Sequence, residues 1–201
     1  ANTPSPTVVG YTGDWTGVDF GTARAQTIAG SLNYLGAGYA AGAGDHIGVL
    51  NNTTGGEITS ANSGRMYRLL DSSLAVNSST VGTLYLSWLF QSGQETGATT
   101  YQMLDLYNGN TLDANRTFTA GLTMNGGNTG SQYDFGVTEA YTSTGVAADT
   151  GVHLFVVKFD LSAANLSDNV TLWLDPTLGA GDPTGGITVS GKNLVWDRLA
   201  I

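Results

Sequence analysis

The stretch "VHLFVVKFDLS", residues 152–162, decides the fold class of this chain. Successive side chains of a β-strand point to opposite faces, so Phe155 and Val157 share one face. Leu154 and Val156 make the other face apolar as well. Strands that are apolar on both faces are typical of the centre of a sheet. The stretch therefore predicts a central β-strand.

Similar apolar runs recur along the chain at intervals of roughly ten to fifteen residues, with Gly-rich turns between them, which is the pattern of a sandwich or barrel. In "TLYLSWLFQ", residues 83–91, one face carries four large apolar side chains: Leu84, Leu86, Trp88 and Phe90. No segment of helical length shows an apolar period of 3.6 residues. We therefore expect an all-β fold, either a sandwich or a barrel, as one domain over residues 8–201 behind an extended arm at 1–7.

The composition narrows the classes of function. Of 201 residues, 29 are Gly and 11% are charged, which suits short strands and tight turns. The formal net charge of −9 would repel nucleic acid and an anionic membrane surface, so neither is an expected partner. The same charge attracts divalent cations, which leaves calcium open.

The chain has no cysteine, which excludes disulfides, thiolate metal sites and cysteine nucleophiles. It has no apolar span of about 18 residues, so we expect no membrane insertion. The low lysine content and the abundance of Thr, Asn and Gly are typical of a secreted bacterial protein from which a signal peptide has been removed. We therefore expect a secreted, extracellular or cell-surface location.

Several stretches together resemble one family in their order and spacing. They are "GDWTG" (13–17), "GSLNY" (30–34), "GTLYLSWLFQSG" (82–93), "NRTFTAGLTMNGG" (115–127), "FGV" (135–137), "VHLFVVKFDLS" (152–162), "DNVTLWLDP" (168–176) and "NLVWDRLAI" (193–201). This pattern resembles the LamG-like (concanavalin A-like) β-sandwich domains of secreted Planctomycetes and Verrucomicrobia proteins. The resemblance implies two antiparallel sheets packed face to face in a jelly-roll sandwich, with a glycan-recognition or adhesive role. It rests on strand pattern rather than on a catalytic signature.

The chain departs from that family at both ends. Related domains usually have a further strand before "GDWTG" and another after "DRLAI", whereas this sequence begins with "ANTPSPT" and stops at Ile201. A missing edge strand leaves backbone groups that another chain can complete. We therefore expect that copies of the chain could assemble, with the arm adding a strand to a neighbour.

The acidic residues do not form a catalytic pair. Glycosidases need two carboxylates about 5–10 Å apart, but the only glutamates, Glu57, Glu95 and Glu139, lie far apart in sequence. Asp168 and Asp175 flank a strand that would hold them about 20 Å apart. His46 and His153 lack a nucleophile motif and are interpreted as structural residues at strand starts. We predict that the chain is not an enzyme.

Calcium is the better candidate cofactor, because it needs only oxygen ligands, whereas zinc would need more than two histidines without cysteine. Asp14, Asp45 and Asp197 are the candidate ligands. Related sandwiches place a structural calcium where the first and last strands meet, which favours Asp14 and Asp197. The alternative is that each aspartate serves only its turn.

A glycan site needs exposed aromatic rings beside hydrogen-bonding groups. Trp173 alternates with Leu172 and Leu174, so it is predicted to share the strand face opposite the core with Asp175. A ring covered by a loop is the alternative for Trp173. Four further aromatic residues are predicted to lie in Gly-rich loops, as sugar platforms or as packing plugs: Trp15, Tyr39, Tyr133 and Tyr141.

The sequence leaves two functions open. The first is a non-catalytic surface recognition or adhesive module whose partner is a glycan or another cell-surface polymer. The alternative is a structural subunit that self-assembles into an extracellular filament or matrix by strand complementation through the arm. A polysaccharide-degrading enzyme is the third and weakest hypothesis.

Overall fold

The fold is taken from a computed structural model of the chain. It describes residues 11–20, 23–28, 46–51, 63–91, 102–109, 116–123, 132–138 and 140–201. For residues 11–20, 23–28, 46–51, 63–66, 102 and 123 only the backbone is described. The predicted arm at 1–7 lies outside the described residues.

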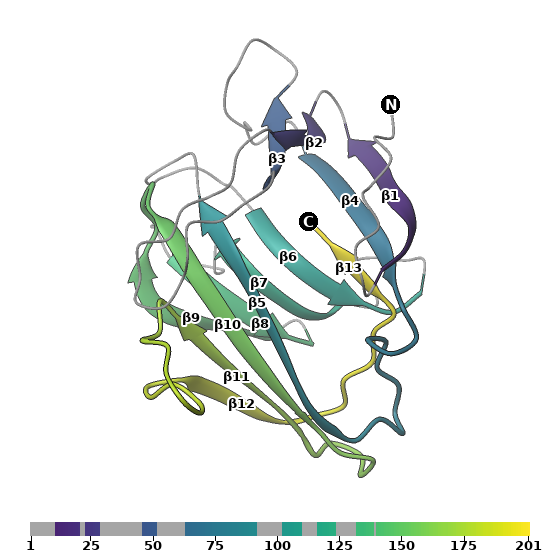
Figure 1. The fold of residues 1–201 in the computed structure, drawn as a ribbon, viewed down its shortest axis with the longest axis vertical. Helices are drawn as coiled ribbons and strands as arrows, with labels where there is room; N and C mark the ends of the chain where they lie inside the picture. Colours follow the sequence, from purple (N-terminus) through teal and green to yellow (C-terminus); the bar gives the residue numbers. More distant parts are fainter. Residues whose placement is uncertain are drawn as a thin grey trace.

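Two antiparallel sheets pack against each other (Figure 1). The larger sheet has seven strands, in the order β1 (Tyr11–Phe20), β4 (Ser63–Leu70), β13 (Arg198–Ala200), β6 (Gln102–Tyr107), β7 (Arg116–Thr123), β8 (Gln132–Val137) and β9 (Ala140–Ala147). The smaller has four, in the order β12 (Ile187–Lys192), β11 (Asp168–Leu174), β10 (Val152–Leu161) and β5 (Gly82–Gln91). β2 (Ala23–Ile28) and β3 (His46–Asn51) form a separate pair. The prediction of an all-β, two-sheet sandwich is confirmed.

The strand predicted to be central is β10, which lies between β5 and β11 in the smaller sheet. Its side chains at Phe155, Val157 and Phe159 face the other sheet and are at most 1% exposed. Phe155 stacks on Trp88 of β5, with 4.9 Å between ring centroids, and Phe159 meets Phe118 of β7 edge to face at 5.1 Å. The core therefore lies between β10 and the middle of the larger sheet.

The last strand of the chain, β13, lies inside the larger sheet rather than at its edge. Leu199 pairs with Arg68 of β4 on one side and with Leu106 of β6 on the other. The segment that leads into it is held by Asp168, which is 3% exposed and accepts the backbone N–H of Leu194 at 2.7 Å and that of Ser162 at 2.8 Å. One buried carboxylate thus ties the start of β11 to the approach of β13.

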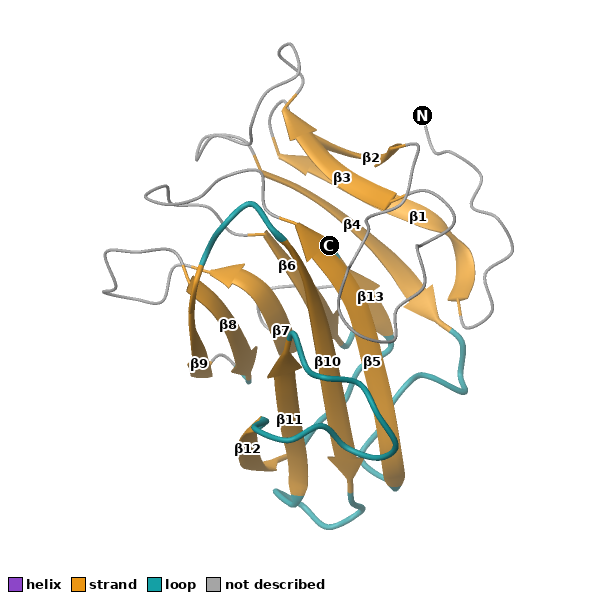
Figure 2. Ribbon diagram, turned by 60° about the vertical axis from the view of Figure 1, so that its left-hand side comes forward, coloured by secondary structure: helices purple, strands orange, loops and turns teal. Residues whose placement is uncertain are grey.

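The segment 175–186, which joins β11 to β12, folds back over the outer face of the smaller sheet (Figure 2). Trp173 lies beneath its end: a Cβ on Gly186 would come within 2.5 Å of the indole Nε1 of Trp173. Only glycine allows the backbone to approach the ring this closely. Within the described residues, no helix has the length and apolarity needed to cross a membrane.

Candidate functional site

Trp173 is not an exposed sugar platform. Its alternation was predicted correctly, because it points away from the core, but the ring is only 6% exposed. The expectation of a partly exposed ring is therefore wrong, and the alternative of a loop-covered ring holds. The loop that covers the ring, residues 175–186, is bonded to the sheet through Asp182, which accepts hydrogen bonds from Tyr85 and Lys158.

Tyr133 and Tyr141 lie in strands β8 and β9, which corrects their predicted placement in loops. Tyr133 points into the core and is fully buried, so it cannot stack on a ligand. Tyr141 lies on the outer face of the larger sheet, where its hydroxyl accepts a hydrogen bond from Arg116 at 3.2 Å. Trp15 belongs to β1, where only the backbone is described, and Tyr39 lies outside the described residues.

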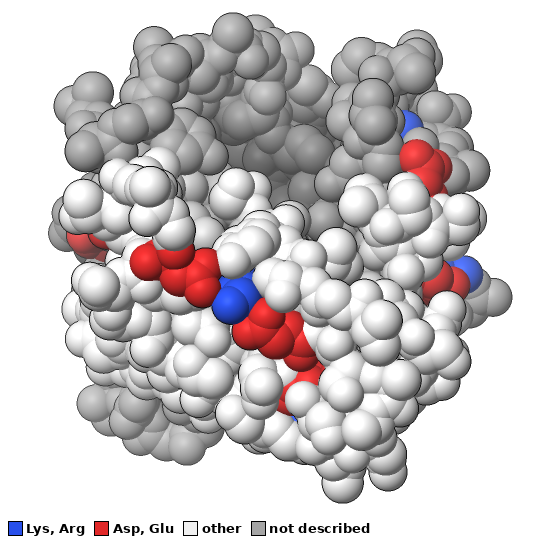
Figure 3. All heavy atoms as spheres, turned by 60° about the horizontal axis from the view of Figure 1, so that its bottom comes forward, with Lys and Arg blue, Asp and Glu red and all other residues white. Residues whose placement is uncertain are grey.

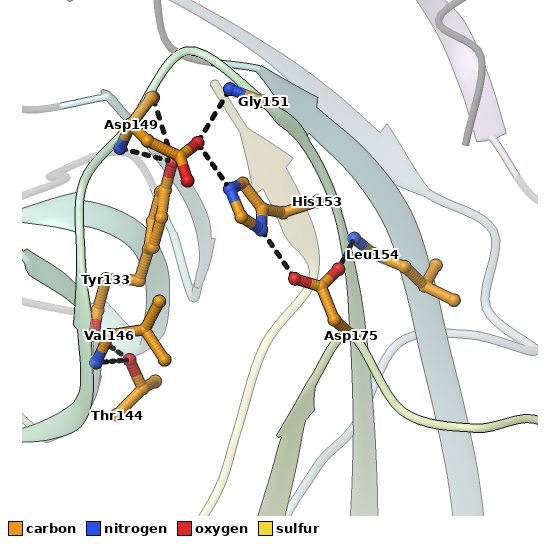
Figure 4. A network of polar contacts seen from close by, with 8 residues as sticks. All are labelled: Tyr133, Thr144, Val146, Asp149, Gly151, His153, Leu154 and Asp175. Carbon is orange, nitrogen blue, oxygen red and sulfur yellow. Dashed lines mark hydrogen bonds and ion pairs between the residues drawn. The ribbon is translucent and has the colours of Figure 1, made fainter. Parts of the chain in front are cut away.

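The described residues bring two of the predicted site residues, Asp175 and Tyr133, into one polar network around His153 (Figure 4). Asp175 follows β11 with a left-handed backbone, φ 50°, a conformation that Asp tolerates better than most residues. The turn directs its carboxylate to His153 Nδ1 at 2.6 Å and to the backbone N–H of Leu154 at 2.8 Å. It therefore binds the start of β10 and does not lie beside Trp173 as predicted.

The second nitrogen of His153 is also paired with a carboxylate. Nε2 lies 2.8 Å from Asp149 Oδ1, and the same oxygen accepts the backbone N–H of Gly151 at 2.6 Å. Tyr133 completes the network, because its ring lies 4.6 Å from the imidazole and its hydroxyl donates to the Asp149 carbonyl at 3.2 Å. The network joins β8, the β9–β10 turn, β10 and the end of β11.

The electrostatics of the network favour a charged imidazole. Burial by itself lowers the pKa of His153, but hydrogen bonds and charge from Asp175 and Asp149 outweigh it and raise the pKa above 6.5. The hydrogen bonds from His153 and Gly151 lower the pKa of Asp149 below 3.8. An imidazolium with both nitrogens donating to carboxylates has no lone pair for a metal or for general-base work. His153 therefore joins the turn before β10 to the end of β11, and we call this charged arrangement a structural latch.

Of the three calcium candidates, only Asp197 has a described side chain. Asp197 Oδ1 accepts the backbone N–H of Gly109 at 3.1 Å and the Nε of Arg198 at 3.2 Å. Asp14 lies in β1, which β4 separates from β13 in the larger sheet, and only its backbone is described, so the shared site of Asp14 and Asp197 stays a prediction. Asp45 lies outside the described residues. Among the residues whose side chains are described, no three of His, Asp or Glu gather as a metal-ligand set.

An open hollow of about 440 Å³ lies beside Asp197, between the segment after β4 and the segment before β13. Asn77 and Asn108 line it with polar groups, and Trp196 forms part of its wall. The Trp196 ring is 3% exposed and its Nε1 donates to the Leu74 carbonyl at 3.0 Å. The indole is therefore committed to the fold and offers no stacking surface in the hollow.

The outer face of the smaller sheet carries a patch that the sequence did not single out, built around Tyr85 and Lys158. These two residues are direct cross-strand neighbours on β5 and β10. Asp182, from the covering loop, accepts the Tyr85 hydroxyl at 2.5 Å and the Lys158 ammonium at 2.9 Å. Asp160 lies 3.2 Å from the same ammonium and accepts the Thr83 hydroxyl at 2.8 Å. We call these five residues the outer-face patch.

The charges of the outer-face patch are balanced against one another. The hydrogen bond from Tyr85, and then that from Lys158, lower the pKa of Asp182. The bonds to Asp182 and Asp160 raise the pKa of Lys158. The Tyr85 side chain remains 58% exposed beside them. Figure 3 shows acidic side chains gathered in a band across the surface, with a basic group within it.

The missed residues have weak sequence signals. Lys158 is the one lysine or arginine in the stretch 152–162. Asp149 lies four residues before His153 in the chain. The role of Asp182 could not be inferred from the sequence, because its partners lie 97 and 24 residues away in the chain. Comparison with models of known protein families, with curated proteins and with solved structures gives no match.

Proposed function

We propose that this chain is a non-catalytic recognition module that acts outside the cell and binds glycan on the outer face of its smaller sheet. The observation that carries the proposal is the outer-face patch, in which an exposed tyrosine ring stands beside a lysine and two aspartates. The sequence hypothesis also placed the site on a strand face opposite the core, but at Trp173, which lies on β11 and not on β5.

The chemistry of the patch suits a sugar. An aromatic ring fixed at one end offers its face to the apolar side of a pyranose, and the bond from its hydroxyl to Asp182 reduces the entropy lost on binding. Asp160, Asp182 and Lys158 supply acceptors and donors for hydroxyl groups within the same surface. These polar groups already bind one another, so a ligand would meet them pre-arranged.

The same contacts support binding rather than catalysis. A glycosidase needs one carboxyl group with a raised pKa to act as general acid. In the patch the pKa of Asp182 is lowered, and Lys158 lies between the two carboxylates. In the His153 network the pKa of Asp149 is also lowered.

The test begins with a glycan array probed with the purified chain, followed by calorimetry on the strongest oligosaccharide. Tyr85→Ala should weaken binding at least tenfold, which is about 1.4 kcal/mol, because the stacking surface is lost. Tyr85→Phe should keep most of the affinity, because it retains the ring. Val146→Ala is the control, since Val146 is also exposed, at 39%, but lies on β9 of the other sheet.

An array without hits would refute the proposal, as would a ligand that binds wild type and Tyr85→Ala equally well. A variant that turns over the oligosaccharide, or a wild type that does so, would refute the non-catalytic assignment.

A further inference from the structure

Among the strands that the structure describes, the two main sheets have four edge strands, and three of them pair with their neighbours in interrupted register. In the pairing of β1 with β4 the register shifts between Thr12 and Thr16. In the pairing of β12 with β11 it shifts between Asp168 and Val170 of β11. In the pairing of β9 with β8 it shifts between Gln132 and Asp134 of β8. Such bulges twist an edge and discourage further pairing. These three edges are therefore protected against strand addition.

β9 has a second protection. Its bulge contains Gly145 at φ +75°, and two of its backbone amides are bonded by its own side chains. The Gly145 N–H donates to Ser143 Oγ at 3.0 Å, and the Val146 N–H to Thr144 Oγ1 at 3.2 Å. Amides bonded in this way cannot pair with an incoming strand.

The fourth edge, β5, has neither protection. It pairs with β10 without a shift over ten residues, from Gly82 opposite Leu161 to Gln91 opposite Val152. Its sequence, GTLYLSWLFQ, contains no charged residue and no proline. β10 is its one partner among the described strands. An edge of about 33 Å that is straight, uncharged and apolar is a template for another strand.

Among the described residues, the core-facing side chains of β5 are less buried than those of β10. The core-facing side chains of β10 are at most 1% exposed from Phe155 to Phe159. The side chains beside them on β5 face the same core but are only partly buried: Leu84, Leu86, Trp88 and Phe90. A further strand along β5 would cover this apolar row.

We propose that the free edge of β5 binds an extended segment of another polypeptide by strand addition. The segment carries uncharged, apolar side chains at alternate positions, because every second residue would lie over the partly buried row. Backbone hydrogen bonds supply affinity, and the alternate side chains supply specificity. This proposal does not depend on glycan binding.

The arrangement of the sheets favours the addition of one isolated strand to the β5 edge over the pairing of β5 with the β5 of a second copy. A twofold β5–β5 pair would place both smaller sheets side by side in one plane. The larger sheet, however, continues past β5 with β13, β4 and β1 (Figure 1). The larger sheets of two copies would therefore collide. The arm "ANTPSPT" is also a poor donor, because Pro4 and Pro6 lack the N–H that a ladder needs.

The first experiment is hydrogen exchange of the free chain, read residue by residue. Alternate amides of β5 should exchange at least tenfold faster than the amides of β10, because only every second β5 amide faces β10. If all amides from 82 to 91 are as protected as those of β10, the edge is already covered and the proposal fails.

The second experiment uses a fluorescein-labelled decapeptide of alternating Val and Thr and measures its anisotropy. We expect saturable binding that slows exchange of the fast β5 amides at least tenfold. A peptide N-methylated at alternate residues should not bind. Leu86→Lys, which puts a charge into the apolar row, should weaken binding at least tenfold. Val189→Lys is the matched control, because Val189 is also partly buried against the core, but on the opposite edge strand, β12.

Failure of the peptide to bind, or equal weakening by Leu86→Lys and Val189→Lys, would overturn the proposal. Self-association of the chain that the peptide competes away would support it and would identify the donor as a second copy. Loss of glycan affinity in Tyr85→Ala tests a different contact, so either proposal can fail without the other.

Discussion

Replacing His153 with leucine should destabilise the chain by an amount that depends on pH. The variant removes two charge-assisted hydrogen bonds, 2.6 Å to Asp175 and 2.8 Å to Asp149, and leaves two carboxylates facing each other across an apolar group. Such bonds contribute about 1.5–3 kcal/mol each when buried. The Asp149 and Asp175 side chains are 56% and 35% exposed, so water would replace part of what is lost. We expect a loss of about 2 kcal/mol near pH 6, or about 4–8 °C in Tm.

The sign of the pH dependence follows from the direction of the pKa shift. Because the pKa of His153 is raised above 6.5 on folding, its contribution is fully present below pH 6.5 and is lost as the pH rises through the folded value. The pKa of Asp149 is lowered, so its contribution is present above pH 3.8 and is lost as the pH falls through its folded value. The difference in Tm between wild type and variant should therefore be largest near pH 5–6 and shrink towards pH 9.

The assay is thermal denaturation, followed by circular dichroism, at intervals from pH 4 to pH 9.5. Tyr133→Phe is the control, because it removes a hydroxyl from the same network but keeps the imidazole and both carboxylates. It should lower the Tm by an amount that does not change between pH 5 and pH 9. A His153→Leu difference that is flat over this range, or that grows with pH, would refute the assignment of a charged latch.

Three further outcomes are expected. Gly186→Ala should lower the free energy of unfolding, measured by urea denaturation, by about 2 kcal/mol, because its Cβ would meet Trp173 at 2.5 Å. Gly179→Ala is the control and should change this free energy little, because a Cβ there would have no atom within 4 Å. Asp168→Ala should cost about 3 kcal/mol in the same assay, because two backbone N–H groups lose their buried acceptor, and an effect below 1 kcal/mol would contradict that role. Phe155→Ala should cost about 3–5 kcal/mol by calorimetry, since the ring is fully buried between two sheets, and a small loss would mean that the core collapses around the site.

The parts of the fold that could be predicted from the sequence are those that depend on neighbouring residues. The alternation of 153–161 placed Phe155 and Val157 towards the core, and the alternation of 83–91 separated Leu86 from Tyr85 correctly. Strand periodicity is local, so it needs no knowledge of which strands pair. The jelly-roll family, the calcium and the glycan stay predictions.

The site could not be predicted, because it depends on register and on loop paths. Asp175 reaches His153 because β10 pairs with β11 so that Phe155 stands opposite Leu174, and Asp149 reaches it through the path of the turn between β9 and β10. Trp173 is buried by Gly186, thirteen residues further along a loop whose path no periodicity describes. The turn at Asp175 also reverses the direction that strict alternation assigned to it.

The position of β13 has a consequence for the order in which the larger sheet forms. Residues 198–200 insert between β4 and β6, so the larger sheet is split into two parts until β13 is in place. The partners of Leu199 lie 131 and 93 residues earlier, so closing the sheet is a long-range and intrinsically slow step. A truncation of the last four residues should leave β4 and β6 facing each other without a bridge.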